Sequence, residues 1–436
     1  MLRPLLAGAR DTLGRLAEAQ GLAEALDLDV AHAENAPVRE ISPATLFGSG
    51  RVERLKEQVA EAKAGVVVVD GLLSPVQQRN LERAIEAKVI DRTGLILEIF
   101  GRRAQTKEGR LQVELARQQY ERSRLVRTWT HLERQRGGLG KTGGPGETQI
   151  ELDRRQIADR IVRLKRDLED VRRTRALQRR ARSRAGLPAI VLVGYTNAGK
   201  SSLFNRLTDA SVFAKDMPFA TLDPTARLVK LGPGGVSGRS VVISDTVGFI
   251  SDLPTELVAA FRATLEAVVE ADLLIHVRDV AHPETEAQRA DVLSVLAQLV
   301  KDGERKLPPV LEAWNKIDLL DEATRHARLR RAEKQDASPL TQTLAPIAVS
   351  ALTGEGMDQL RAAIDRGAFA ATRIVTITLE PGDGKTRARI AAAGRIIDET
   401  HDETGFATRT AELSGEDAAR FAPLSPLPEE LKPAAE

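Results

Sequence analysis

The sequence predicts an α/β protein. A doubly wound sheet lies between an N-terminal α/β domain, which carries a long antiparallel helical hairpin, and a small C-terminal α/β domain. Six short apolar runs alternate with helical segments in the central part, a pattern typical of a doubly wound sheet. Apolar residues at alternating steps of four and three, after a glycine-rich stretch, predict two packed helices. The expected boundaries are residues 1–105, 106–185 for the hairpin, 186–366 for the central domain and 367–436, which ends in a flexible tail.

The N-terminal part alternates strand and helix patterns, which predicts a parallel sheet. Val66–Asp70 (VVVVD) is a β-branched run typical of a buried strand. Gly94–Phe100 (GLILEIF) is a second strand candidate. Between them, Ser74 precedes Pro75 and Gln77 in the order of a capping box, so we expect a helix to begin there.

Two long helices are predicted around Glu133–Arg155 (ERQRGGLGKTGGPGETQIELDRR). The seam between them comprises Leu111, Leu115, Leu125, Trp129 and Leu132 on the first helix and Ile157, Ile161, Leu164, Leu168 and Val171 on the second. Helices joined by a short turn-rich loop pack antiparallel, and each should be about 40 Å long. The glycine-rich stretch is then the tip of a hairpin, and Ala181–Pro188 (ARSRAGLP) is the linker that follows it.

Two glycine-rich stretches end in Gly-Lys-Thr, but neither has the spacing of a phosphate loop. Such a loop needs a glycine, four residues and then Gly-Lys-Ser/Thr. In the hairpin tip the required first glycine falls on Gln135, and for Gly382–Thr386 (GDGKT) it falls on Leu379. The C-terminal part is expected to form a strand (RIVTITLE), a helical region around ARIAAAGRI and a disordered tail, PLSPLPEELKPAAE.

Charge is strongly segregated along the chain. From Arg102 to Arg184 there are 24 Lys/Arg against 11 Asp/Glu, a net charge of +13, so the remainder of this +2 chain carries −11. A basic arm suits contact with a polyanion, and a solvated pair of Arg-rich helices is the alternative. The absence of cysteine, of a signal peptide and of any apolar run long enough to span a bilayer predicts a cytoplasmic protein with no membrane span.

The central domain is expected to use the apolar runs AIVLV, RLVKLG, SVVIS, ADLLIHV, PVLEAW and PIAVS as its strands. After the first strand, GYTNAGKS has the full spacing of a phosphate loop, with Gly194, Gly199, Lys200 and Ser201 at the defining positions. Backbone N–H groups and the helix N-terminus offer positive potential to phosphates. Lys200 would reach the β- and γ-phosphates, and the hydroxyl of Ser201 would bind Mg²⁺.

Downstream residues at strand ends complete a guanine nucleotide site. Asp245 in SVVISDTVGF can hold a water of Mg²⁺, and Gly248 can offer its N–H to the γ-phosphate. In NKID, Asp318 can accept hydrogen bonds from N1 and N2 of guanine, a pair that adenine lacks. In SAL, the N–H of Ala351 would face the guanine O6. The predicted ligands are therefore GTP and GDP.

The segment MPFATLDPTARL should supply a hydroxyl that completes the Mg²⁺ shell; Thr221 is the choice and Thr225 its competitor. The expected metal ligands are Ser201, Thr221 and Asp245, and the expected catalytic residues are Lys200, Thr221 and Gly248. The nucleotide-contacting set is Gly194, Tyr195, Thr196, Asn197, Ala198, Gly199, Lys200, Ser201, Ser202, Phe219, Ala220, Thr221, Leu222, Asp223, Asp245, Thr246, Val247, Gly248, Asn315, Lys316, Asp318, Ser350, Ala351 and Leu352.

With these motifs the chain resembles the HflX family, ribosome-associated P-loop GTPases of the translation-factor-related class. The nucleotide motifs GYTNAGKS, FATLD, DTVGF, NKID and SAL match, as do LSPVQQRNLE, DRTGLILEIF, EGRLQVELA and the highly specific GGPGETQIELDRR. The resemblance implies binding to the large ribosomal subunit and splitting or rescue of stalled ribosomes. One departure is a short N-terminus before Ala44, so the first strand of that domain is expected to be reduced.

The resemblance also favours rRNA contact by the basic hairpin. Arg134, Arg136, Lys141, Arg154 and Arg155 are the predicted RNA-binding residues. With aromatic residues at 3%, binding should depend on charge and shape more than on base stacking. A monomer is the expected state.

Two residues bear on hydrolysis. Phe249 stands where many small GTPases have a water-orienting glutamine, so we expect slow intrinsic hydrolysis that rRNA, a repositioned loop or K⁺ completes. Asn197 could ligate K⁺, or it could only hydrogen-bond within its loop. The alternative function is a non-enzymatic assembly factor that uses GTP as a conformational latch. An RNA-remodelling ATPase activity in the N-terminal domain is disfavoured because no second phosphate loop is present there.

Overall fold

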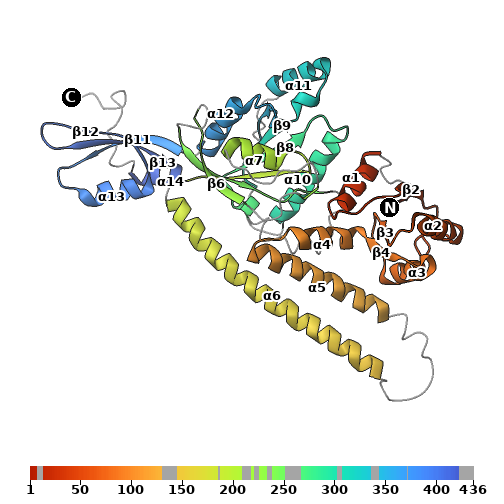
Figure 1. Cartoon of the computed structure of the whole chain (residues 1–436). Coiled ribbons are helices and arrows are strands. Elements are labelled where there is room, and N and C mark those ends of the chain that lie inside the picture. Colours follow the sequence, from red (N-terminus) through yellow and green to blue (C-terminus); the bar gives the residue numbers. More distant parts are fainter. Residues whose placement is uncertain are drawn as a thin grey trace.

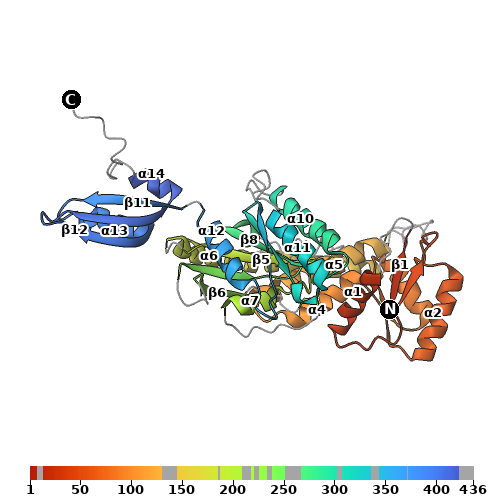
Figure 2. The same ribbon diagram turned by 90° about the horizontal axis from the view of Figure 1, so that it is seen from above.

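The computed structural model describes residues 1–6, 13–129, 145–184, 187–208, 218–219, 225–232, 238–250, 267–301, 307–334, 343–370 and 372–421. Figure 1 shows an N-terminal α/β domain, a long pair of helices, a central sheet flanked by helices, and a C-terminal domain. Seen from above, the N- and C-terminal domains lie at opposite ends of the molecule with the central sheet between them (Figure 2).

The N-terminal domain is built on a four-stranded parallel sheet of order β2-β1-β3-β4, as the alternating pattern predicted. Its elements are β1 (Leu2–Leu5), α1 (Leu13–Glu24), β2 (Glu34–Pro37), α2 (Ser49–Ala62), β3 (Val66–Val69), α3 (Pro75–Ile85), β4 (Lys88–Asp91) and α4 (Arg92–Arg103). β1 has four residues, like the other three strands, and its expected reduction relative to the family stays a prediction. The capping box is confirmed, because Ser74 Oγ accepts from Gln77 N and Gln77 Oε1 accepts from Ser74 N.

The expected strand Gly94–Phe100 is wrong, because it lies inside helix α4. Asp91 caps that helix, since its Oδ1 accepts from Gly94 N at 2.8 Å. Five of the seven residues of this run are buried and only Glu98 is exposed, so a window this short does not show a period of 3.6. The signal in the sequence was the N-cap aspartate three residues before the glycine.

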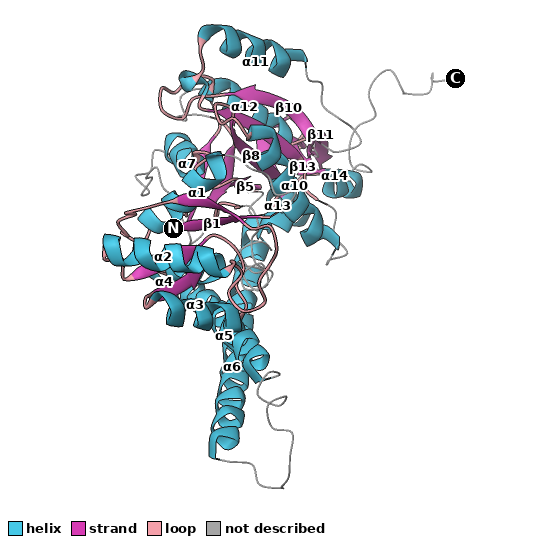
Figure 3. Cartoon of the chain, turned by 90° about the vertical axis from the view of Figure 1, so that its right-hand side faces the viewer, coloured by secondary structure: helices cyan, strands magenta, loops and turns pink. Residues whose placement is uncertain are grey.

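The hairpin consists of α5 (Lys107–Trp129) and α6 (Pro145–Arg184), which run antiparallel and project away from the rest of the chain (Figures 1 and 3). With 40 residues α6 is about 60 Å long, more than expected, because it begins within the predicted tip and continues into the predicted linker. The seam is confirmed for Leu111, Leu115, Ile157, Ile161, Leu164 and Leu168, which form one apolar cluster. Val171 is half-buried and is not part of that cluster, and the side chains of Leu125 and Trp129 lie outside the description. Leu132 lies outside the described residues.

The central domain has a six-stranded sheet of order β10-β9-β8-β5-β7-β6, in which only β6 is antiparallel to its neighbour. All six predicted strands are confirmed. The elements are β5 (Ala189–Gly194), α7 (Lys200–Thr208), β6 (Thr225–Lys230), β7 (Ser240–Asp245), β8 (Leu273–Asp279), α10 (Thr285–Lys301), β9 (Val310–Asn315), the 3₁₀ turn η3 (Ile317–Leu319), α11 (Glu322–Lys334), β10 (Thr343–Ala348) and α12 (Met357–Ala368).

The two faces of this sheet are covered differently. One face packs against α7 and α12 in a core that belongs to the central domain alone. The other face packs against α10 and also against the N-terminal domain, because a single apolar cluster joins Leu22 of α1 and Phe100 of α4 with Val191 and Val193 of β5. The N-terminal and central domains therefore share one core.

The C-terminal domain is a three-stranded antiparallel sheet of order β11-β13-β12 with two helices packed on it. Its elements are β11 (Thr372–Leu379), α13 (Gly384–Ala393), β12 (Gly394–His401), β13 (Ala407–Ser414) and α14 (Gly415–Phe421). The GDGKT stretch starts α13, where Asp383 Oδ1 accepts from Thr386 N. The predicted helical region ends at Ala393, and its last residues belong to β12.

Candidate nucleotide-binding site

The loop between β5 and α7 has the backbone that a phosphate cradle needs. Gly194 has φ +154°, and a Cβ there would lie 2.3 Å from the carbonyl oxygen of Val277. Gly199 has φ +89°, and its Cβ would lie 2.2 Å from Nδ2 of Asn315. Because no other residue fits either place, the glycines of the motif are required by close approach. Asn197, exposed between them, has φ +60°, a conformation that asparagine tolerates.

Lys200 begins α7 with its side chain buried in the site. Its Nζ donates to the carbonyl oxygen of Tyr195 at 2.7 Å. Burial lowers the pKa of Lys200 to about 8, although the carboxylate of Asp245 partly opposes this. Gly248 lies against the same group, since a Cβ there would come 2.9 Å from Nζ. The loop lysine and the DxxG glycine therefore lie together, as the roles predicted for them at a γ-phosphate would require.

Two oxygen donors converge beside this lysine. The hydroxyl of Ser201 donates to Oδ2 of Asp245 at 2.7 Å, and Asp245 is fully buried at the end of β7. A second oxygen of this carboxylate accepts from the N–H of Thr246, whose own hydroxyl donates to Leu192 O at 2.6 Å. A hydroxyl and a carboxylate suit Mg²⁺, which is held in proteins by one or two such groups together with substrate phosphates.

One asparagine joins the loops that are predicted to hold the base. Asn315 Nδ2 donates to Ala198 O at 2.9 Å, and its Oδ1 accepts from Ala351 N at 3.0 Å. It therefore ties the NKID loop to both the phosphate loop and the SAL loop. Lys316, with φ +65°, pairs with Asp279 at 2.8 Å. The sequence reading missed Asp279; its signal was an aspartate at the end of strand β8.

The remaining predicted site residues differ in how deeply they are buried. Asp318 lies half-buried in η3, Ser350 is buried, and Leu352 and Ser202 are exposed. Thr225 is the first residue of β6, in register with Asp245. Thr221, with Ala220, Leu222 and Asp223, lies outside the described residues, so the choice between Thr221 and Thr225 stays a prediction.

Three aromatic residues of the site are inserted into the core shared with the N-terminal domain: Tyr195, Phe219 and Phe249. Phe219 packs edge-to-face on Phe100 of α4, with ring centroids 4.6 Å apart. Phe249 is bridged to the phosphate loop, since Thr196 N donates to its carbonyl oxygen at 2.7 Å. Phe249 is therefore a packing residue at the position where other GTPases have a glutamine. No pattern in the sequence indicates these contacts.

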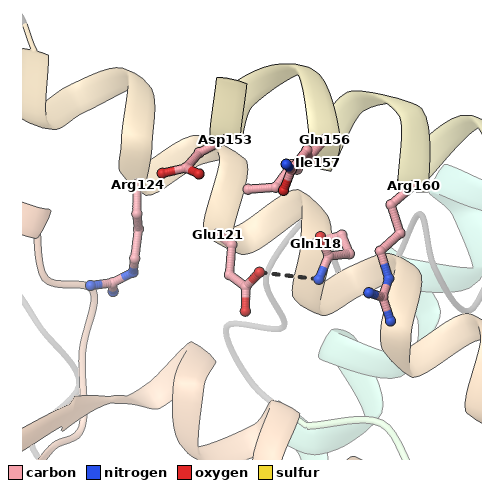
Figure 4. Close-up of a pocket in the computed structure, with 7 residues that line it drawn as sticks. All are labelled: Gln118, Glu121, Arg124, Asp153, Gln156, Ile157 and Arg160. Atoms are coloured by element: carbon pink, nitrogen blue, oxygen red, sulfur yellow. Dashed lines mark hydrogen bonds between the residues drawn. The ribbon is translucent and has the colours of Figure 1, made fainter. Parts of the chain in front are cut away.

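The structure describes only some of the basic residues predicted to bind RNA. Arg154 and Arg155 lie exposed on α6, whereas Arg134, Arg136 and Lys141 lie outside the described residues. Between α5 and α6 is a pocket of about 480 Å³ lined by side chains of both charges, including Glu121, Arg124 and Asp153 (Figure 4). This pocket is not a uniform anion site. Nor does any helix within the described ranges combine the length and apolar character that a bilayer crossing needs.

Three family models match the chain. They are described as "GTP-binding GTPase N-terminal" over residues 14–101, "GTP-binding GTPase Middle Region" over 103–182 and "50S ribosome-binding GTPase" over 189–316. The middle region coincides with the helical hairpin, and the third match begins at β5 and ends just after Asn315.

Curated relatives are similar over most of the chain. GTPase HflX of Magnetococcus marinus is 47% identical over 406 residues, which cover 93% of this chain and 89% of that protein. GTPase HflX of Escherichia coli is 44% identical over 363 residues, covering 83% and 81%. Among solved structures, a GTP-binding protein from Sulfolobus solfataricus in complex with GDP matches with 24% identity and a TM-score of 0.44, over 85% of this chain and 98% of that chain.

Proposed function

Since this chain belongs to the HflX family of GTPases, and so binds and hydrolyses GTP, we propose that it docks its basic hairpin on the large ribosomal subunit under the control of the bound nucleotide. Splitting or rescue of stalled ribosomes is the further role that we propose for the docked state. A purely non-enzymatic latch does not fit a family of GTPases. We expect a cytoplasmic monomer.

The observation that supports docking is the charge of the hairpin. Its region carries +13 in a chain of +2, and α6 bears exposed Arg154 and Arg155 on a rod that projects from the body (Figure 3). Phosphate contacts made by such a surface supply affinity without base readout. The description of the matching family as a 50S ribosome-binding GTPase favours rRNA as the polyanion.

The positions of the described residues support a separate role for each group of residues at the nucleotide. Lys200 and Gly248, which lie together, would contact the γ-phosphate, and the N–H groups of Asn197–Lys200 would surround the β-phosphate. Ser201 and Asp245 fit Mg²⁺, which when bound neutralises charge on phosphate oxygens. Asp318 would read the guanine edge, and Asn315 would hold the loops around it.

Hydrolysis should be slow without a partner. Phe249 is 5% exposed and packs in the shared core, so it cannot orient water. A group from rRNA, a repositioned loop or K⁺ at Asn197 would orient the attacking water or stabilise the charge of the transition state. Equal GTP turnover in KCl and NaCl would exclude the role of K⁺.

Nucleotide-dependent co-sedimentation with purified large subunits tests the docking. Wild-type protein should pellet with subunits better with a non-hydrolysable GTP analogue than with GDP. Reversing Arg154 and Arg155 to glutamate should lower binding and reduce the dependence of log affinity on log salt concentration by about one to two. The matched control is reversal of Arg330 and Arg331, an adjacent exposed pair on α11, which should bind as wild type.

Equal loss of subunit binding in both double variants would mean that only the total charge of the protein matters. That result would reject the hairpin as the docking element. A second measurement addresses the nucleotide: Asp318→Asn should shift preference from guanine towards xanthine nucleotides. Retained strict preference for guanine would contradict the role of Asp318.

A further inference from the structure

Tyr195 in the phosphate loop is held at both ends. Its carbonyl oxygen accepts from Lys200 Nζ at 2.7 Å, and its hydroxyl donates to Oε2 of Glu18, a residue of α1 in the N-terminal domain. The ring between them is 5% exposed and packed in the shared core. A displacement of Glu18 would therefore move the carbonyl group that orients Lys200.

Glu18 in turn is held by a buried arginine. Arg92 Nη2 lies 2.6 Å from Glu18 Oε1, and Arg92 Nη1 donates to Asp70. Burial alone would lower the pKa of Arg92, but Asp70 and Glu18 raise it, so the guanidinium stays charged. A buried arginine cannot lose one of its carboxylates without cost, which fixes Glu18 in place.

The residue before Arg92 contacts the hairpin. Asp91 accepts from the hydroxyl of Tyr120 at 2.7 Å and from Arg124 Nη2 at 2.6 Å, and both donors belong to α5. Gly94 makes room for this contact, because a Cβ there would lie 3.4 Å from the hydroxyl of Tyr120. Burial, together with Asp91, raises the pKa of Tyr120 and keeps its hydroxyl a donor.

We propose that Glu18 is a positioning residue that couples the phosphate loop to the hairpin. The path, called the relay below, runs from Tyr195 through Glu18 and Arg92 to Asp91, and from Asp91 to Tyr120 and Arg124. Its outer end, Arg124, also lines the pocket between α5 and α6 (Figure 4). Nucleotide binding and the α5 contacts then bias each other by equal free energies.

GDP dissociation from the purified full-length protein tests the relay without any ribosome. Glu18→Gln keeps the shape of the side chain but weakens the contacts to Tyr195 and Arg92, and should speed release of a fluorescent GDP analogue about tenfold, the effect of a charge-assisted hydrogen bond. Tyr120→Phe removes one hydroxyl far from the nucleotide and should speed release about threefold. The double variant should release GDP no faster than Glu18→Gln alone, because both changes interrupt one path.

The matched control is Glu98→Gln, which removes a carboxylate of α4 that pairs with Arg117 of α5 at 2.8 Å and lies outside the relay. It should release GDP at the wild-type rate. The relay would be rejected if Tyr120→Phe released GDP at the wild-type rate, or if the effects of the two substitutions were additive in the double variant. The contacts would then only hold the domains together. If Glu18→Gln fails to fold, Glu18→Asp is used in its place, and the GDP release rate of Tyr120→Phe still tests the relay. Since only GDP is used, a failed relay leaves ribosome docking untouched, and failed docking leaves the relay untouched.

Discussion

On one side of the GTPase sheet the N-terminal domain shares a continuous apolar core with it, whereas the C-terminal domain keeps a core of its own. The contact between the central domain and the C-terminal domain depends largely on one arginine. Arg239 Nε donates to Asp365 of α12 at 2.9 Å, its Nη1 pairs with Glu412 of β13, and the guanidinium stacks on Phe369. Figure 2 shows the C-terminal domain set apart from the sheet.

The difference teaches which neighbour can influence the nucleotide. Three aromatic residues of the predicted nucleotide site lie in the core shared with the N-terminal domain, so we expect a change there to reach the site through close packing. In the part of the chain that the structure describes, Arg239 contacts Asp365, Glu412 and Phe369, none of which belongs to the predicted nucleotide-contacting set. We therefore expect the N-terminal contact to set both stability and affinity, and the C-terminal contact to set little beyond the orientation of its domain.

The largest expected effect comes from Phe100→Ala. Phe100 is fully buried against Phe219, so its truncation leaves a cavity and should lower the free energy of unfolding by about 3–5 kcal/mol. GDP affinity should fall as well, because Phe219 lies in the predicted nucleotide-contacting set. Urea unfolding and GDP titration measure the two quantities, and an unchanged affinity would break the comparison.

Phe421→Ala is the counterpart in the other core. Phe421 is 2% exposed at the end of α14, and its loss should destabilise the C-terminal domain by about 3 kcal/mol. GDP titration should give the wild-type affinity. A fall in affinity equal to that of Phe100→Ala would mean that both domains govern the site.

A smaller effect should appear with pH, because the charged group of Lys200 is buried in the site. The pKa of Lys200 is lowered to about 8 by burial, and bound phosphates would raise it again. The contribution of its charge to GDP binding is thus complete below pH 8 and declines above it, by at most about tenfold per pH unit. Isothermal titration from pH 7 to 9.5 measures this, with Lys200→Ala as the variant that should bind weakly and show no such decline.

The smallest effect is expected for Arg239→Ala. The side chain is 25% exposed, so its ion pairs are partly screened and their loss should cost about 1 kcal/mol. Small-angle scattering should show a broader range of domain orientations, with GDP affinity unaffected. An unfolding midpoint lowered as much as by Phe100→Ala would show that the second contact is as strong as the first.

The sequence predicted local features well and long-range ones poorly. The strands of the central sheet and the spacing of GYTNAGKS were readable because each depends on neighbouring residues. The helix at Gly94–Phe100 was not predicted, since a short apolar run with a single exposed residue, Glu98, does not distinguish a helix from a strand. The contact of Glu18 with Tyr195 joins residues 177 positions apart, and no pattern within either segment indicates the other.

Asn315 illustrates the limit within the site itself. Its place in NKID was evident, but its side chain bridges Ala198 and Ala351, and this role follows only from the folded arrangement of three loops. A motif states which residue types are present, and packing decides which of them hold the others in position.

The length of α6 has a mechanical consequence. The helix ends at Arg184, shortly before β5 begins at Ala189, and β5 ends at Gly194 in the phosphate loop. A stiff lever of about 60 Å that tilts by a few degrees sweeps its far end through several ångströms, while its near end barely moves. A small rotation that began beside the phosphate loop would thus reach the far end of α6 as a displacement of several ångströms.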